Sequence, residues 1–184
     1  GGHLGHQHGT EALVHGDLHT GSVMVRSADG EEGPADSVRA DSVKAFDSEF
    51  AFYGPVAFDL GALWGNYVIA AARATALGDD ERAAWALGLC TRTWDAFEAG
   101  FRDAWAGGRA DPRMFGDDLR EHLLATWRSE AWLFGAAKMT RRIVGLAKTT
   151  DIETLPPPLR EGAARGVPSA ARRGRRPRAA ACCR

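Results

Sequence analysis

The spacing of the apolar residues changes near Phe58, and this change limits the folds that the chain can adopt. Before it, the short apolar runs at 12–14, 22–26 and 42–46 are separated by polar or glycine-rich stretches, which is typical of strands around a turn. After it, apolar and small residues recur every three or four positions, which is typical of helices. We therefore predict an α+β chain with a strand–loop–strand unit followed by a helical block.

The helical block divides into three predicted segments. The stretch DLGALWGNYVIAAARATAL predicts a first helix that ends at Gly78. Asp79 and Asp80 suit the N-terminus of a second helix, because short polar side chains cap free backbone N–H groups there. A third helical segment is expected from about 117 to 147, with a break at Gly135 as an open alternative.

Composition divides the chain into one domain and two terminal segments. A chain of 184 residues with 45% hydrophobic residues can bury one ordinary core, so we expect one domain over 11–158. Residues 1–10 are rich in Gly and His and predict a flexible leader. Residues 159–184 hold eight of the 23 basic residues and one of the 24 acidic ones, and predict a disordered basic tail. We expect neither a nucleic-acid partner nor a membrane span, and we expect a cytoplasmic protein.

The stretch LVHGDLHTG at 13–21 contains the first candidate for chemistry. Asp17 follows a predicted strand and is flanked by His15 and Gly16. A carboxylate held in a rigid loop directly after a strand can accept a proton from a hydroxyl nucleophile, or orient that hydroxyl. We therefore predict that Asp17 acts on a hydroxyl group.

A second acidic pair, Asp47 and Glu49, follows the last predicted strand with Ser48 between them. If Ser48 points away, as in an extended strand, both carboxylates face one side and form an oxygen site suited to Mg²⁺. An isolated Asp-x-Glu is otherwise typical of a solvated strand end. A candidate base followed by a candidate metal pair, in this order and spacing, indicates phosphoryl transfer.

Three motifs resemble known enzyme families. The stretch HGDLHTGS at 15–22 resembles the catalytic loop of protein-kinase-like small-molecule kinases, the group that contains aminoglycoside phosphotransferases and choline kinases. FDSEFAFYGPVAFDLG at 46–61 and GAAKMTRRIVGLAKTTDIE at 135–153 are similar to the S-methyl-5-thioribose kinase family. The resemblance covers roughly residues 11–155, with the motifs in the family's order.

This resemblance implies a fold and a reaction. The implied fold is a protein-kinase-like C-terminal lobe, mainly helical, with a short β-hairpin that carries the catalytic and metal loops. The implied reaction transfers the γ-phosphate of ATP to the 1-hydroxyl of methylthioribose, a step of methionine salvage. Mg²⁺ would be the cofactor, ATP the co-substrate, methylthioribose the small-molecule partner, and a homodimer is allowed by the same resemblance.

The resemblance also implies roles for single residues. Asp17 would be the catalytic base or the group that orients the hydroxyl. His19 is left open between a substrate contact and a hydrogen bond within the loop. The remaining roles are Asp47, Glu49 and the weaker ligand Ser22 for the metal, Arg141 and Arg142 for the substrate, and His15 and Asp59 as structural support for the catalytic loop.

The sequence departs from the family in one respect. Kinases of this kind have a preceding lobe with a phosphate-covering loop and a lysine that engages the phosphates. Here no G-x-G-x-x-G occurs, and the three lysines, Lys44, Lys138 and Lys148, all follow the catalytic loop. We therefore expect the N-terminal lobe to be absent and the chain to be inactive by itself. Two alternatives stay open: a related phosphotransferase on an aminoglycoside or choline type of substrate, and a non-catalytic kinase-lobe fragment.

Overall fold

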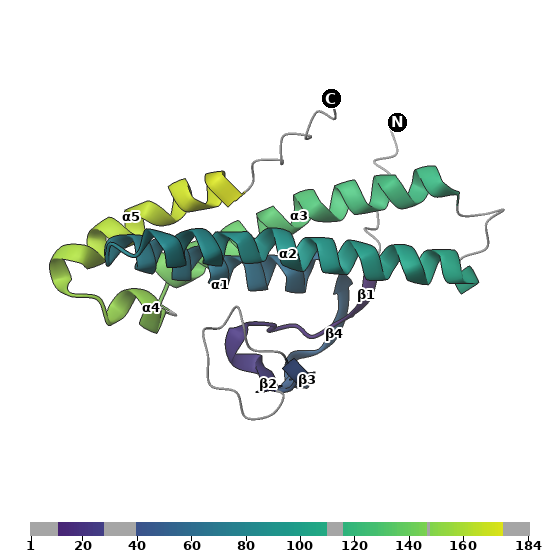
Figure 1. Ribbon diagram of the computed structural model, residues 1–184, viewed down its shortest axis with the longest axis horizontal. Helices are drawn as coiled ribbons and strands as arrows, with labels where there is room; N and C mark the ends of the chain where they lie inside the picture. Colours follow the sequence, from purple (N-terminus) through teal and green to yellow (C-terminus); the bar gives the residue numbers. More distant parts are fainter. Residues whose placement is uncertain (1–10, 28–39, 110–115, 147, 175–184) are drawn as a thin grey trace, which may run out of the picture.

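The computed structural model describes residues 11–27, 40–109, 116–146 and 148–174. Its long helices run roughly along the longest axis of the molecule, and the strands project from one side of this helical layer (Figure 1). The described part is mostly helical with two small sheets, in agreement with the predicted α+β class. The helices are α1 (Ala57–Ala76), α2 (Asp80–Ala104), α3 (Asp117–Ile143), α4 (Thr150–Glu153) and α5 (Pro157–Gly174).

The strands form two antiparallel pairs, one nested inside the other in sequence. The outer pair joins β1 (Glu11–Val14) to β4 (Phe52–Pro55), and the inner pair joins β2 (Val23–Ser27) to β3 (Ala40–Ala45). This nesting brings the loops 15–22 and 46–51 together at the junction of the two sheets. The sequence reasoning missed β4, because that strand is only four residues long and contains Gly and Pro.

The first two helices begin and end close to the predicted positions. Helix α1 ends at Ala76, and Gly78 then adopts a positive φ of 77°, a conformation that glycine reaches without steric cost. The carboxylate of Asp79 caps α2 by accepting a hydrogen bond from the Arg82 backbone N–H at 2.9 Å.

Helix α3 runs without a break through Gly135. This glycine allows close packing against α1 and does not end the helix. A Cβ atom at Gly61 of α1 would lie 2.4 Å from the Ala131 carbonyl oxygen and 2.6 Å from the Phe134 Cβ. A Cβ atom at Gly135 would lie 3.0 Å from the Gly61 carbonyl oxygen. Helices α1 and α3 therefore approach so closely at this point that no side chain fits between them.

The predicted disordered tail is wrong for residues 159–174, which form most of α5 and pack against α1. Ala163, Val167 and Ala170 are buried, and their spacing of four and three residues places them on one helix face. The high content of Arg, Gly and Pro obscured this narrow apolar stripe. Residues 175–184 and the predicted leader 1–10 lie outside the described residues.

The described helices contain none that is both long and apolar enough to cross a membrane.

The close approach of α1 and α3 can be tested with two glycine substitutions. Gly→Ala inside a helix normally stabilises by roughly 0.5–1 kcal/mol, because glycine loses more backbone entropy on folding. We expect Gly61→Ala to destabilise the fold by about 1–3 kcal/mol instead, because the added methyl group overlaps the α3 backbone. Urea unfolding followed by circular dichroism measures the difference.

The matched control is Gly100→Ala in α2, where an added Cβ meets no atom within 4 Å. This variant should be at least as stable as the unsubstituted chain. Equal effects of the two substitutions would contradict the packing role of Gly61.

Candidate active site

The loop 15–22 is held in place by Asp59 at the start of α1. The carboxylate of Asp59 accepts hydrogen bonds from the backbone N–H of His15 at 2.6 Å and of Gly16 at 3.1 Å. Gly16 has a positive φ of 84°, and a Cβ atom there would lie 2.0 Å from the Phe50 carbonyl oxygen. The loop therefore needs glycine at 16, and the two N–H donors fix its orientation relative to α1.

The same loop is tied to the loop 46–51, which carries the acidic pair. His15 Nε2 lies 2.8 Å from the Phe46 carbonyl oxygen, and the Phe46 backbone N–H donates to the Ser22 carbonyl oxygen at 3.0 Å. Together with the contact of Gly16 with Phe50, these bonds join the two loops into one unit. These bonds place His15 and Asp59 in contact with the backbone of the two loops, and their supporting role stays a prediction.

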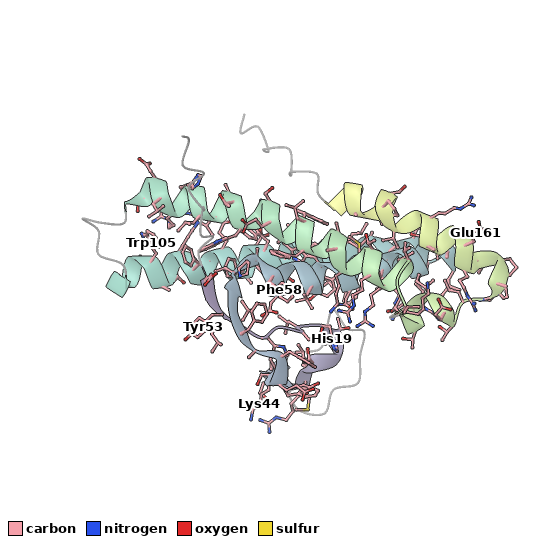
Figure 2. The ribbon with its side chains drawn as sticks, turned by 180° about the vertical axis from the view of Figure 1, so that it is seen from behind. His19, Lys44, Tyr53, Phe58, Trp105 and Glu161 are labelled. Atoms are coloured by element: carbon pink, nitrogen blue, oxygen red, sulfur yellow. The ribbon has the colours of Figure 1, made fainter. Side chains whose placement is uncertain are left out.

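Asp17 lies between the strands and the helical layer, where its carboxylate pairs with Lys138 of α3. Lys138 Nζ donates to Asp17 Oδ1 at 2.8 Å, and the lysine side chain is only 11% exposed. His19 Nε2 lies 3.6 Å from Asp17 Oδ2, too far for a normal hydrogen bond. In Figure 2, His19 and Phe58 lie between the strands and the helices, whereas Lys44 lies on the side of the strands that faces away from the helices.

The pKa of Asp17 reflects opposing effects. Partial burial raises this pKa, because a buried carboxylate loses water. The hydrogen bond and positive charge of Lys138, with the charges of His19 and Arg142, lower it more, so the net pKa falls below the ordinary value of 3.8. Asp17 is therefore an ionised, acceptor-only group at neutral pH.

Asp47 and Glu49 are exposed and occupy a tight turn instead of a strand. The 3-10 turn Ser48–Phe50 begins after Asp47, whose backbone is left-handed with φ 68° and ψ 45°. The alternation of a strand, on which the same-side prediction rested, therefore does not apply. A left-handed aspartate is uncommon, and such conformations are concentrated at functional sites.

The chemistry of this acidic pair fits magnesium. Mg²⁺ is commonly bound by one or two carboxylates together with substrate phosphates and water, and the exposed side chains of Asp47 and Glu49 leave room for both. Among the described residues, no group of three or more His, Cys, Asp or Glu could hold a metal by itself. Within the described part of the chain, Asp47 and Glu49 would therefore need phosphate or water ligands to complete the coordination of the ion.

The polar side chains of Ser22 and His19 both form hydrogen bonds within the loop 15–22. Ser22 is buried, with only 2% of its surface exposed. Its hydroxyl oxygen accepts a hydrogen bond from the His19 backbone N–H at 2.9 Å and lies 2.9 Å from the His19 carbonyl oxygen, to which it donates. His19 Nδ1 accepts from the Gly21 N–H at 3.0 Å. These bonds close a short 3-10 turn, and they occupy the hydroxyl that was expected to reach the metal.

Both predicted arginines lie on the side of α3 that faces Asp17. Arg141 lines a cavity of about 190 Å³ together with Asp17 and Lys138, and the charge of Arg142 helps to lower the pKa of Asp17. The sequence reasoning missed Lys138. Its signal was present in KMTRR, because residues three and four positions apart, such as Lys138, Arg141 and Arg142, share one helix face.

The chain is similar to methylthioribose kinases over about four-fifths of its length. It is 34% identical over 161 positions to methylthioribose kinase 1 of Oryza sativa subsp. japonica, covering 79% of this chain and 34% of that protein. It is 34% identical over 144 positions to the methylthioribose kinase of a Geobacillus strain, covering 78% of this chain and 32% of the relative. For the Escherichia coli enzyme the identity is 30% over 160 positions, covering 79% of this chain and 35% of that protein.

These matches support a relationship to kinases of this family, and the chain spans about a third of the length of the curated relatives it matches. No protein-family model matches the chain.

The pairing of Asp17 with Lys138 predicts a change in the pKa of Asp17. We expect Lys138→Met to raise this pKa, because the substitution removes the hydrogen bond and the nearest positive charge. The Asp17 carboxyl ¹³C resonance, followed through a pH titration, measures the shift. Lys44→Met on the exposed hairpin is the control and should leave the titration unchanged.

The difference in stability between the wild type and Lys138→Met should also depend on pH, and should become smaller as the pH falls. Because the pKa of Asp17 is lower in the folded state than in the unfolded chain, its pairing stabilises the fold above pH about 4. That stabilisation is lost as the pH falls through the folded-state pKa. A stability difference between the wild type and Lys138→Met that grows on acidification would contradict the assignment.

Proposed function

We propose that this chain is the part of a methylthioribose kinase that activates the acceptor hydroxyl and holds the metal. The main support for this proposal is the position of the Asp17 carboxylate. Its loop is held by hydrogen bonds to Asp59, and the carboxylate lines a cavity together with Lys138 and Arg141. The similarity to three methylthioribose kinases supports the substrate class. In this proposal, the fold is the C-terminal lobe of a protein-kinase-like enzyme of methionine salvage in the cytoplasm.

Asp17 accepts a hydrogen bond from the 1-hydroxyl of methylthioribose and takes its proton as the phosphoryl group arrives. Its low pKa keeps it ionised, which suits orientation of the hydroxyl more than strong proton abstraction. Lys138 and the two arginines add positive charge beside the reaction centre, where negative charge is carried by the transferred group. Mg²⁺, when bound with ATP, neutralises phosphate charge, and Asp47 and Glu49 are the residues that would hold it.

The charges around Asp17 favour a neutral sugar over the alternative substrates. Lys138 contacts Asp17, Arg141 lines the same cavity, and Arg142 acts on Asp17 through its charge. Aminoglycosides and choline are cations, so three nearby positive side chains oppose their entry more than the single carboxylate attracts them. A neutral polyol meets no such repulsion, and its hydroxyl groups can accept hydrogen bonds from these side chains.

The function can be tested in a chimera with a full-length relative. The segment of the Geobacillus kinase that aligns with this chain is replaced by the aligned part of this chain. We expect ATP-dependent phosphorylation of methylthioribose and a loss of about 10²-fold or more in kcat for Asp17→Asn, because the amide cannot accept the proton.

Asp103→Asn, an exposed position on α2, is the matched control and should retain full activity. An active Asp17→Asn chimera would overturn the role of Asp17. A chimera that prefers kanamycin or choline over methylthioribose would overturn the substrate assignment.

The acidic pair predicts a change in the metal requirement of the same chimera. We expect Glu49→Gln to raise the Mg²⁺ concentration needed for half-maximal activity, because a charged ligand becomes a neutral amide. Titration of activity with MgCl₂ at fixed ATP measures this change. The control Glu130→Gln on α3 should leave the titration unaltered, and an unaltered titration for Glu49→Gln would make Glu49 structural.

A further inference from the structure

The side chain of Lys138 leaves α3 at a point where α1 has only a glycine. A Cβ atom at Gly65 would lie 3.3 Å from the Lys138 Cβ and 3.4 Å from its Cγ. One turn earlier, a Cβ atom at Gly61 would lie 2.6 Å from the Phe134 Cβ. The same kind of contact thus repeats after four residues on both helices, and the first carbons of the Lys138 side chain pack directly on the α1 backbone.

The ammonium group of Lys138 binds one oxygen of Asp17 and leaves the other free. Lys138 Nζ donates to Oδ1 at 2.8 Å, and the lysine side chain is 11% exposed. Asp17 Oδ2 accepts no hydrogen bond from the described residues; His19 Nε2 lies 3.6 Å away, beyond normal hydrogen-bond distance. The carboxylate therefore has one oxygen held by the lysine and one that keeps its capacity to accept a hydrogen bond.

We infer that Lys138, held in place by Gly65, is a positioning residue that fixes the Asp17 carboxylate through Oδ1 and leaves Oδ2 to contact the acceptor hydroxyl. This inference rests on the proposed function, which supplies the hydroxyl. A carboxylate turns easily about its last bond, because that torsion has broad energy wells, and a hydrogen bond from a charged donor restrains the rotation. Asp17 is thus oriented before the acceptor binds, which lowers the entropy cost of aligning the hydroxyl with the phosphoryl group.

Loss of the ammonium group has two opposing effects on the proposed reaction. It makes Asp17 a stronger base, because the nearest positive charge is gone. It also lets the carboxylate rotate. Catalysis of phosphoryl transfer depends mostly on positioning and electrostatic stabilisation, and a misplacement of about 1 Å can cost about 10²-fold in rate. We therefore expect the loss of orientation to outweigh the gain in base strength.

The position of the Lys138 side chain can be measured in the full 184-residue chain without catalysis. After selective ¹³C labelling of lysine, the ε-methylene spectrum contains signals from only Lys44, Lys138 and Lys148. We expect Asp17→Asn to shift the Lys138 signal, because the charged acceptor of its ammonium group is lost. The other two lysine signals serve as internal controls and should stay in place. A Lys138 signal that does not respond to Asp17→Asn would overturn the inference.

The contact with Gly65 is tested in the same spectrum. Gly65→Ala should also shift the Lys138 signal, because the added methyl group displaces the side chain by a few tenths of an ångström. Gly100→Ala, where an added Cβ meets no atom within 4 Å, is the matched control and should leave the signal in place. Equal responses to the two alanine substitutions would overturn the role of Gly65.

Kinetics of the chimera with the Geobacillus kinase separate positioning from a direct effect of charge. We expect Lys138→Met to lower kcat about 10-fold or more. In a chimera that already carries Asp17→Asn, the same substitution should lower kcat by no more than about 2-fold, because no base is left to orient. A lysine that acted directly on the transferred phosphoryl group would cost the same in both backgrounds. Equal losses in the two backgrounds, or an unchanged kcat for Lys138→Met alone, would overturn the inference.

Gly65→Ala extends this comparison to the packing contact. It should lower kcat several-fold in the chimera, and it should have no further effect in the Lys138→Met background, where the side chain has no ammonium group to displace. The same loss in both backgrounds would indicate a general effect on the fold and would overturn the role of Gly65.

The outcome is separable from the test of the proposed function. A chimera that phosphorylates no acceptor, with the lysine signals of the chain responding as expected, would overturn the proposed reaction and leave the placement of the carboxylate by Lys138 assigned. An active chimera with equal losses in the two Asp17 backgrounds would overturn the positioning role alone.

Discussion

The close crossing of α1 and α3 at Gly61 and Gly135 is the constraint on which the site depends. Two residues before this crossing, Asp59 of α1 holds the backbone of the loop 15–22. One turn after it, Lys138 of α3 reaches Asp17. The two helices are in backbone contact at this point, with no side chain between them. The loop, which is bound to α1, and Lys138, which lies on α3, are therefore held in fixed positions relative to each other. The distance between Asp17 and Lys138 thus follows from helix packing.

Much of the fold could be predicted from local patterns. The first strand, the inner hairpin and the first two helices follow from hydrophobic spacing and from caps such as Asp79, all of which act within a few residues. Helix α5 could not be predicted in this way, because its helicity depends on burial of Ala163, Val167 and Ala170 against the core. Tertiary contacts of this kind override a composition that is otherwise typical of disorder.

The candidate site was predictable where a motif is continuous in sequence and not where it is assembled in space. Asp17, Asp47 and Glu49 stand out by their order, and their roles stay predictions. Lys138 and Phe134 are ordinary helix residues until α3 packs across α1, which no local pattern specifies. Ser22 shows the opposite case. Its place in the motif suggested a metal ligand, but its hydroxyl group forms hydrogen bonds with the backbone of His19 in the same loop.

The pairing of Asp17 with Lys138 also has a consequence for how the chain folds. It joins residues 121 positions apart, so closing that contact costs chain entropy that local hairpins and helices do not. Chains dominated by such long-range contacts fold more slowly than chains dominated by local ones. The strands and loops of residues 11–55 alone would retain both acidic motifs but lack the cation. Formation of this ion pair therefore reports on the packing of α3 across α1 and onto the loop that carries Asp17.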